Sequence, residues 1–521
     1  MDALWSKLPP GRPSLLAQGA LVGIITYWVV WIIYTRTFHP LAKFPGPFWA
    51  SVTRFWTVLH VFPGDTEKRQ RKLHAEYGPV VRIAPNELIT SDPEAIKTLY
   101  GVKSATTKTD FYLAFRPPWA RFPDHFSSEG GKQHGDRRRI VSHVYTMTSV
   151  LQAEKYIEKC IDVWLEKLGE ISDRRQSFDF WIWSRMYAYD VIGELYFSKM
   201  FGFLQAGGDH LGYIDATDDL IPVQFLAGNM PTYARGLFML TGIMFPKVRG
   251  ALKALDNLTN ATNEMLKGRI AALESDDNDD DVAASKPQRA DILGKLLDIM
   301  LKRGEEVDFE IRDVKMESFG GFFAGSETTA LTLSGIIYHI LRTPRAYTKL
   351  QAEIDAAASS GQLSSPHIAY TEAIKLPYLV ACVKEGMRMH PITGVSFPRH
   401  APAQGCSIGG YYIPGNARIG VNPGVLHFDK TVFGDDADVF RPERWLEASA
   451  DEERAMDGCV MQFGMGARTC LGKNISLCEI YKAIPQLMKE FTFELATKEE
   501  MQTTSYWLHK PVAIEVNVRR R

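Results

Sequence analysis

The stretch FGMGARTCLG, residues 463–472, constrains the fold of this chain most tightly. Three glycines surround a single cysteine, Cys470, and helical periodicity begins directly after it. Glycine lets backbone N–H groups approach closely, and a helix N-terminus favours a thiolate over a thiol. Phe463 can shield the sulfur from water, and Arg468 can pair with an anionic group. A structural turn would not need this spacing, so the segment predicts a cradle for a negatively charged sulfur.

The N-terminal region contains a segment suited to a membrane. LLAQGALVGIITYWVVWIIY, residues 15–34, has no charged residue, and twenty helical residues span about 30 Å, the thickness of a bilayer core. A cleaved signal peptide is the alternative, but its apolar part is usually shorter and ends at small residues. We expect a tail over 1–14 and an uncleaved transmembrane anchor over 15–34. The flanking lysines and arginines favour the cytoplasmic side for the rest of the chain.

The remaining sequence predicts one large domain. Prolines and a glycine over 35–50 indicate a stiff, non-helical connector, and no later stretch resembles an interdomain linker, so we expect a catalytic domain over 51–521. A strand pair is predicted within 77–91. Apolar residues recur at helical spacing over 147–171, 178–201, 311–341 (with Asp308 as its N-cap) and 379–390. The fold class is therefore mainly α with small β-sheets (α+β).

Composition excludes several functional classes. The formal net charge of -1 provides no basic field for nucleic acid. Six sparse cysteines without a CxxC pair do not suggest a disulfide framework, and thirteen scattered histidines without HExxH do not suggest a zinc site. No GxGxxG motif follows a predicted strand, so the sequence carries no nicotinamide or flavin fingerprint of its own.

The 463–472 segment matches F-x-x-G-x-R-x-C-x-G at every fixed position and so resembles the heme-binding signature of the cytochrome P450 family. The resemblance implies the P450 fold and heme b, iron protoporphyrin IX, with Cys470 as the axial iron ligand. AGSETT, residues 324–329, resembles the family's oxygen-activation motif. Glu327 and Thr328 would then relay protons, and the Thr328 hydroxyl would bond back to the carbonyl of Ala324.

Further family motifs imply roles for other residues. Glu385 and Arg388 match the E-x-x-R pair, and Arg444 in FRPERW completes a network that is structural rather than catalytic. The heme propionates need cations. His134 and Arg138 stand at the family's W-x-x-x-R spacing, with His134 in place of the tryptophan, and Arg399 and Arg468 match two other propionate-binding arginines.

The resemblance also implies a substrate pocket above the heme that suits a hydrophobic small molecule. One of the two phenylalanines before AGSETT should face this pocket. The expected lining residues are Phe322 or Phe323, Thr393, Val395, Phe397 and Trp507.

The same resemblance implies a heme monooxygenase and its partners. Electrons would come from NADPH through a separate membrane-bound cytochrome reductase, and cytochrome b5 could assist. Exposed basic residues such as Lys473 could steer the acidic reductase toward the chain. The chain looks like fungal microsomal members of natural-product pathways, which implies the endoplasmic reticulum membrane. Two alternatives stay open: a heme-thiolate enzyme for desaturation, oxidative coupling or rearrangement, and a non-enzymatic heme-binding protein.

Overall fold

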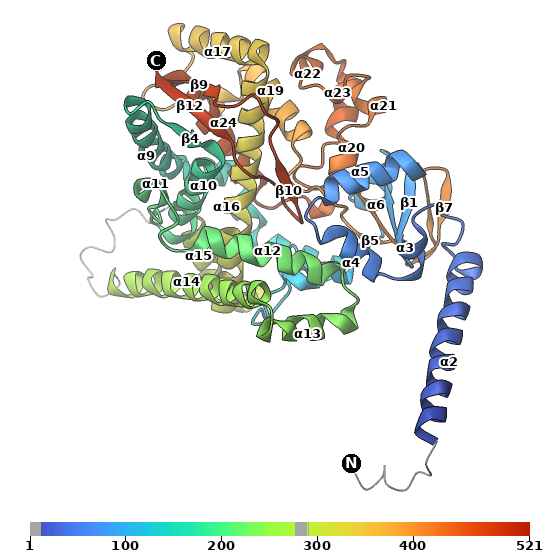
Figure 1. Cartoon of the computed structure of the whole chain (residues 1–521). Coiled ribbons are helices and arrows are strands. Elements are labelled where there is room, and N and C mark those ends of the chain that lie inside the picture. Colours follow the sequence, from blue (N-terminus) through green and yellow to red (C-terminus); the bar gives the residue numbers. More distant parts are fainter. Residues whose placement is uncertain (1–11, 277–288, 290) are drawn as a thin grey trace.

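The computed structural model describes residues 12–276, 289 and 291–521. Its central helix, α16 (Ile311–Arg342), crosses the body and packs against α10 (Phe180–Phe197) and α19 (Pro377–Met389) (Figure 1). The predicted helix over 311–341 is therefore confirmed. Its predicted cap was wrong: a capping box formed by Glu310 and Asp313 starts the helix, and Asp308 lies before it in a left-handed conformation.

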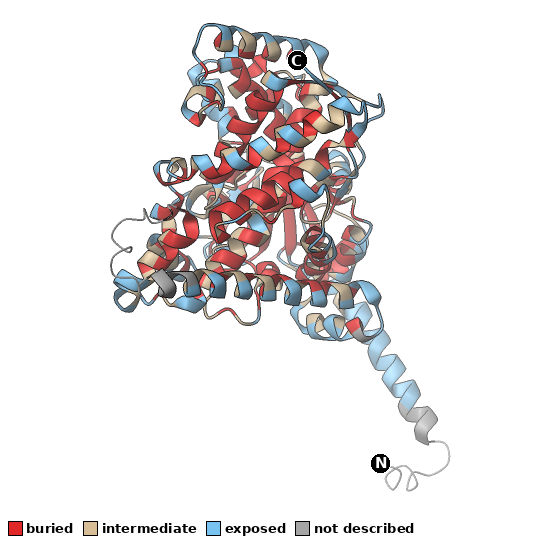
Figure 2. Cartoon of the chain, turned by 90° about the vertical axis from the view of Figure 1, so that its left-hand side faces the viewer, coloured by how far each residue is buried: buried red, intermediate tan, exposed pale blue. Residues whose placement is uncertain are grey.

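Further helices pack around α16, and the buried residues gather in the interior of the body (Figure 2). The longer ones are α2 (Arg12–Ile33), α5 (Thr66–Tyr77), α7 (Gly131–Val141), α9 (Glu154–Asp173), α12 (Tyr213–Asn229), α13 (Thr232–Leu240), α14 (Pro246–Asp276), α15 (Ile292–Val307), α17 (Pro344–Ser359), α23 (Ala450–Asp457) and α24 (Lys473–Glu490). The shorter ones include α3 (Phe48–Val52), α4 (Phe55–Val61), α8 (Met147–Leu151), α22 (Glu443–Glu447) and the 3-10 turns η2 (Asp110–Phe115) and η5 (Gly466–Arg468). The helix predicted over 147–171 is thus divided into α8 and α9.

The strands form small sheets at the edge of the helical body. A five-stranded sheet has the order β1-β2-β8-β5-β3, a three-stranded sheet has the order β4-β12-β9, and two hairpins complete the set. The predicted strand pair within 77–91 is confirmed as β1 and β2. The bounds are β1 (Val80–Ala84), β2 (Glu87–Thr90), β3 (Thr107–Lys108), β4 (Ser177–Asp179), β5 (Arg399–His400), β6 (Cys406–Ile408), β7 (Tyr411–Ile413), β8 (Arg418–Val421), β9 (Phe491–Leu495), β10 (Thr503–Ser505), β11 (His509–Pro511) and β12 (Glu515–Arg520).

Two glycines let α10 and α16 approach closely. A Cβ atom added to Gly321 would collide with the ring of Tyr196, and one added to Gly325 would lie 2.6 Å from Ile192. Glycine costs about 1 kcal/mol relative to alanine inside a helix. The close packing of the two helices explains why α16 tolerates that cost here.

The apolar helix α2 leaves the body as a single arm (Figures 1 and 2). The span Ala17–Phe38 has a mean hydropathy of 1.6 and is long enough to cross a membrane. Its end is fixed to the body, because Arg82 donates a hydrogen bond to the buried Thr35 carbonyl at 2.9 Å and the Trp31 indole donates to Val52 at 2.8 Å. The expected non-helical connector is helical at both ends, in η1 (Tyr34–Phe38), a π-helical turn, and in α3.

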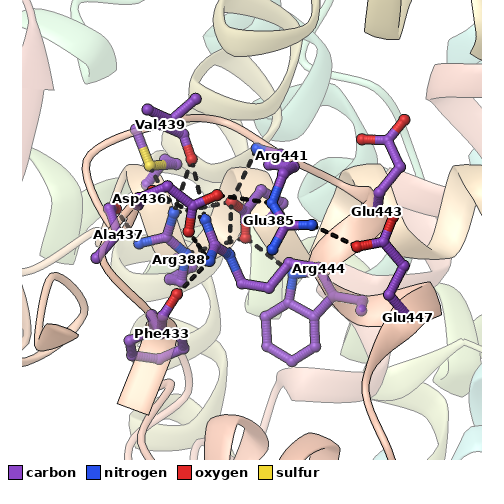
Figure 3. Close-up of polar contacts among 12 residues, drawn as sticks. Glu385, Arg388, Phe433, Asp436, Ala437, Val439, Arg441, Glu443, Arg444 and Glu447 are labelled. Atoms are coloured by element: carbon purple, nitrogen blue, oxygen red, sulfur yellow. Dashed lines mark hydrogen bonds and ion pairs between the residues drawn. The ribbon is translucent and has the colours of Figure 1, made fainter. Parts of the chain in front are cut away.

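A buried ion-pair network joins α19 to the segment that precedes the cysteine loop (Figure 3). Glu385 and Arg388 are both fully buried and pair through two contacts of 2.8 and 2.9 Å. Arg444 lies 3.4 Å from the same carboxylate, and the Trp445 indole donates to it at 2.9 Å. Burial alone would raise the pKa of Glu385, but its bonds to Arg388 hold that pKa below its ordinary value.

The network continues to the cysteine loop through His427. The Arg388 guanidinium donates to the carbonyl of His427 at 2.7 Å, and His427 Nδ1 lies 3.0 Å from the carbonyl of Arg388 and donates to it. The second ring nitrogen then accepts the N–H of Met461 at 2.8 Å. Burial lowers the pKa of His427 to about 3, so its ring is neutral and can make both bonds.

We expect Arg388→Ala to lower the free energy of unfolding by about 3–5 kcal/mol, because it leaves the Glu385 carboxylate buried without its main partner. Urea denaturation and heme content would measure the effect. Arg303→Ala, which breaks an exposed ion pair with Glu306, is the matched control and should leave the denaturation midpoint unchanged. Equal denaturation midpoints for the two variants would contradict the structural role of the buried Glu385–Arg388 pair.

Candidate active site

A large cavity lies beside the middle of α16, between α10, the start of α24 and the segment 392–399. Cys470 and Thr328 both line it, so the fold brings together two motifs that are far apart in the sequence. Other predicted site residues line the same cavity: Phe463, Arg138, Arg399, Arg468, Thr393, Phe397 and Trp507.

The cysteine loop depends on a close approach between two backbone segments. Gly466 has a φ of +61°, and a Cβ atom there would collide with the carbonyl oxygen of Tyr100, so only glycine fits. The N–H of Cys470 donates to the carbonyl of Phe463 at 2.7 Å and closes the loop. The sulfur is therefore held at a fixed position next to the first turn of α24.

Protein surrounds Cys470, although the cavity leaves its side chain accessible. Burial raises the pKa of its thiol above the ordinary value, whereas the N–H groups of Gly472 and Lys473 and the charge of Arg138 lower it. Burial outweighs these groups, so the predicted helix N-terminus acts on the sulfur but does not ionise it alone. A metal cation bound at the sulfur would supply the missing stabilisation.

Four cations face the cavity, two of them buried (Lys108 and Arg399) and two half-buried (Arg138 and Arg468), and none forms an ion pair with a carboxylate of the described residues. Their hydrogen bonds go to neutral oxygens: Lys108 donates to the carbonyl of Phe126 at 2.5 Å and Arg468 donates to that of Ser128 at 2.8 Å. Burial, and then the charges of Arg399 and Arg468, lower the pKa of Lys108 well below its ordinary value. Such a cluster favours an anionic ligand.

His134 lies behind this cluster, in α7, and does not line the cavity. Its ring meets that of His125 edge-on, with centroids 5.9 Å apart, and its Nε2 is buried without a partner among the described residues. Burial and then the charge of Arg468 lower its pKa to about 3. The ring is therefore neutral and keeps an unused hydrogen-bonding nitrogen.

Thr328 and Glu327 have different surroundings. The Thr328 hydroxyl donates to the carbonyl of Ala324 at 2.8 Å, as the sequence predicts. Glu327 is fully buried and is not among the residues that line the cavity. Its carboxylate lies 2.7 Å from Arg185 of α10 and 2.7 Å from Lys510 of β11.

Phe322 and Phe323, of which one was expected to face the substrate pocket, are not among the residues that line this cavity. Phe322 packs against Tyr213 with ring centroids 5.3 Å apart, and Phe323 stacks on Phe319 at 6.1 Å. Successive residues of an α-helix are rotated by about 100° about the helix axis. The glycines of α16 and Ala324 occupy the face of this helix that borders the cavity. Val395 also does not line the cavity; it is buried in a separate cluster of aromatic residues around η2.

Sequence reasoning missed Lys108, Arg185 and Lys510. Lys108 reaches the cavity because β3 pairs with β5, which places it opposite Arg399. Arg185 meets Glu327 from a position 142 residues away. No local pattern marks either contact, because each arises only when distant elements pack together.

The residues present fit an iron porphyrin. Cys470 offers a sulfur ligand at the cavity wall, the unpaired cations match two propionates, and the orphaned nitrogen of His134 lies next to them. Phe397, Trp507 and the glycine face of α16 leave apolar walls for a flat macrocycle and a substrate.

Comparison with known proteins agrees with this geometry. The family model for cytochrome P450 matches residues 45–517. The chain is 37% identical over 509 residues to the cytochrome P450 monooxygenase gsfF of Penicillium aethiopicum, covering 97% of this chain and 99% of that protein. It is 32% identical to the cytochrome P450 monooxygenase cicH of Emericella nidulans (95% and 97% covered) and 31% identical to a pisatin demethylase of Fusarium vanettenii (96% and 92% covered). This chain therefore belongs to the cytochrome P450 family.

Proposed function

We propose that this chain inserts one oxygen atom of O2 into a hydrophobic small molecule, as a step in a fungal natural-product pathway. As a cytochrome P450, it is an oxygen-incorporating oxidoreductase that uses heme b and takes electrons from a separate reductase. The observation that carries the proposal is that Cys470, Thr328 and apolar side chains share one cavity. Its similarity to fungal monooxygenases supports the pathway assignment.

Several residues would hold the heme. Cys470 would ligate the iron, and the four unpaired cations would neutralise the propionates, with His134 as an additional hydrogen-bond donor. When bound, the heme supplies the chemistry that activates dioxygen. Phe463, which lines the cavity seven residues before Cys470, would limit the access of water to the sulfur.

Thr328 and Glu327 would deliver protons. Oxygen insertion consumes two protons in a cavity with apolar walls, so a hydroxyl that lines the cavity and an acid one residue away form a short route. The Thr328 oxygen keeps lone pairs that can accept a hydrogen bond, and its hydroxyl must turn away from Ala324 before it can pass its own proton on. Glu327 must leave Arg185 or Lys510 before it can exchange a proton, which makes these ion pairs part of the route.

The membrane assignment rests on two exposed apolar surfaces. Helix α2 is one, and α13 is the other, where Tyr233, Leu237 and Leu240 are 85%, 70% and 64% exposed. In Figure 1, α13 lies on the side of the body toward which α2 extends. We propose a single-pass anchor in the endoplasmic reticulum membrane with a cytoplasmic catalytic domain over 51–521 and α13 in contact with lipid.

The electron partners are proposed to be the NADPH–cytochrome reductase of the same membrane and cytochrome b5. Lys473 supports a docking site near the cysteine loop. It is exposed at the start of α24, with its ammonium 5.6 Å from the Phe463 ring centroid. An acidic partner bound there would bring its cofactor close to the sulfur side of the cavity.

We expect Cys470→Ser to abolish the thiolate-type absorption band of the reduced, CO-bound protein and the incorporation of labelled dioxygen, since the sulfur ligand is lost. Cys406→Ser, in β6 and outside the cavity, should keep both signals. A thiolate-type band that persists in Cys470→Ser would contradict the assignment, and labelled dioxygen that enters neither product nor water would reject oxygen insertion.

We expect Thr328→Ala and Glu327→Gln each to lower the amount of product formed per NADPH. The larger of the two decreases should be about 10²-fold, because proton delivery by a positioned side chain contributes on that scale. Hydrogen peroxide should rise in compensation. Ser326→Ala, whose hydroxyl bonds Phe322 on the same helix, is the control and should stay coupled. Unchanged coupling in both test variants would contradict the relay.

We expect deletion of residues 1–33 to release only part of the protein from membranes, since α13 retains an apolar surface. Adding Leu237→Ser and Leu240→Ser should release the remainder, as measured by sedimentation with vesicles. Leu301→Ser, at a similarly exposed leucine of α15, is the control. Complete release by the deletion alone would show that α13 does not contact lipid.

A further inference from the structure

The active-site cavity contains a polar corner, formed by His125, Glu317, Tyr145 and Tyr196, that oxygen insertion does not require. His125 Nε2 lies 2.9 Å from one carboxylate oxygen of Glu317, and the Tyr145 hydroxyl donates to the other at 3.4 Å. The Tyr196 hydroxyl donates to that of Tyr145 at 3.3 Å. All four side chains line the cavity, so this hydrogen-bonded chain faces its interior.

The corner is supported by the surrounding packing. The ring of Tyr196 fits against α16 only because residue 321 is glycine. Gly320 borders open space, because a Cβ atom added to it would meet no neighbouring atom within 4 Å. The Glu317 side chain keeps 14% of its surface exposed, whereas that of Glu327 keeps none. Glu317 is therefore accessible from the cavity.

The hydrogen bonds of the corner consume its donors and leave acceptors. The His125 N–H that faces Glu317 and the hydroxyl protons of Tyr145 and Tyr196 all point to oxygens within the corner. The unused capacity consists of lone pairs on the Glu317 carboxylate and the tyrosine oxygens. A complementary ligand must therefore bring a hydrogen-bond donor.

The local charge favours a neutral donor. Burial lowers the pKa of His125, but the adjacent Glu317 carboxylate outweighs burial and raises that pKa. The raised pKa favours an imidazolium–carboxylate ion pair, which carries no net charge. Arg138 adds positive charge beside His125 and Asp124 adds negative charge, since both act on the pKa of His125. A ligand ammonium would be repelled by these cations, and a ligand carboxylate by Glu317, whereas a hydroxyl satisfies the acceptors without added charge.

Helix geometry sets the length of such a ligand. Glu317 precedes Ala324 by seven residues on the cavity face of α16, which corresponds to about 10 Å along the helix axis. A molecule that reaches from the polar corner to Ala324 must therefore span about that distance.

We propose that the polar corner recognises an alcohol or phenol hydroxyl on the substrate and orients an otherwise apolar skeleton about 10 Å long. Glu317 is the main acceptor, and Tyr145 and Tyr196 hold the network in place. This proposal rests on the proposed function, because it assigns a substrate class to the same cavity.

The test measures the preference for a hydroxyl over its methyl ether. The heme-loaded full chain is titrated with 4-hexylphenol, 4-cyclohexylphenol and 4-phenylphenol and with the three corresponding anisoles, using the heme absorption shift and, independently, equilibrium dialysis. We expect at least one phenol to bind about 10-fold more tightly than its ether, the scale of a hydrogen bond to a charged acceptor. Glu317→Leu should abolish this ratio, and Glu317→Gln, which keeps a carbonyl acceptor, should retain part of it.

Controls separate the two proposals. Tyr196→Phe should reduce the ratio, whereas Tyr187→Phe, a buried tyrosine of α10 outside the cavity, should not. Equal binding of phenol and ether in every pair, binding of none of the probes, or an undiminished ratio in Glu317→Leu would overturn the polar corner. The thiolate-type CO band reports on the proposed function separately: if it is present while the ratio is one, only the substrate class is wrong.

Discussion

The buried guanidinium of Arg388 is the constraint on which the position of the cysteine loop depends. It holds the Glu385 carboxylate, donates to the carbonyls of His427 and Ala437, and leaves His427 as a neutral bridge to Met461. Removing a partner from such a pair strands a charge in a low-dielectric interior, so alternative positions of the loop are costly. The sulfur of Cys470 is thereby fixed by a network that touches neither substrate nor cofactor.

The interface between α10 and α16 determines the shape of the active-site wall that lies opposite the cysteine loop. Gly321 and Gly325 admit Tyr196 and Ile192, and this packing selects the face of α16 that borders the cavity. The same interface brings Arg185 to Glu327, while Asp218 of α12 lies 2.8 Å from Arg185 and 2.6 Å from Lys510. A movement of α12 would therefore change the electrostatic environment of the proposed relay, because Asp218 shares both of the cations that hold Glu327.

The sequence predicted the parts of the site whose function depends on local spacing. The cysteine loop, the Thr328 bond to Ala324 and the Glu385–Arg388 pair all join residues within one short segment, and the structure places them as expected. It could not predict which side of α16 faces the cavity, because Phe322 packs against Tyr189 and Phe197 only once α10 is in place. Lys108 was missed for the same reason, since strand pairing brings it to the cavity.

The bonds from Arg82 and Trp31 to the end of the N-terminal helix have a kinetic consequence. A flexible tether would let the body turn freely about the end of α2, whereas these bonds fix the orientation of the body relative to this helix. With α2 in lipid, a body held in this way would stay next to the bilayer, where ligands dissolved in the acyl phase are concentrated. The apparent KM of a lipophilic compound should then scale with its partition coefficient and with the volume of lipid present.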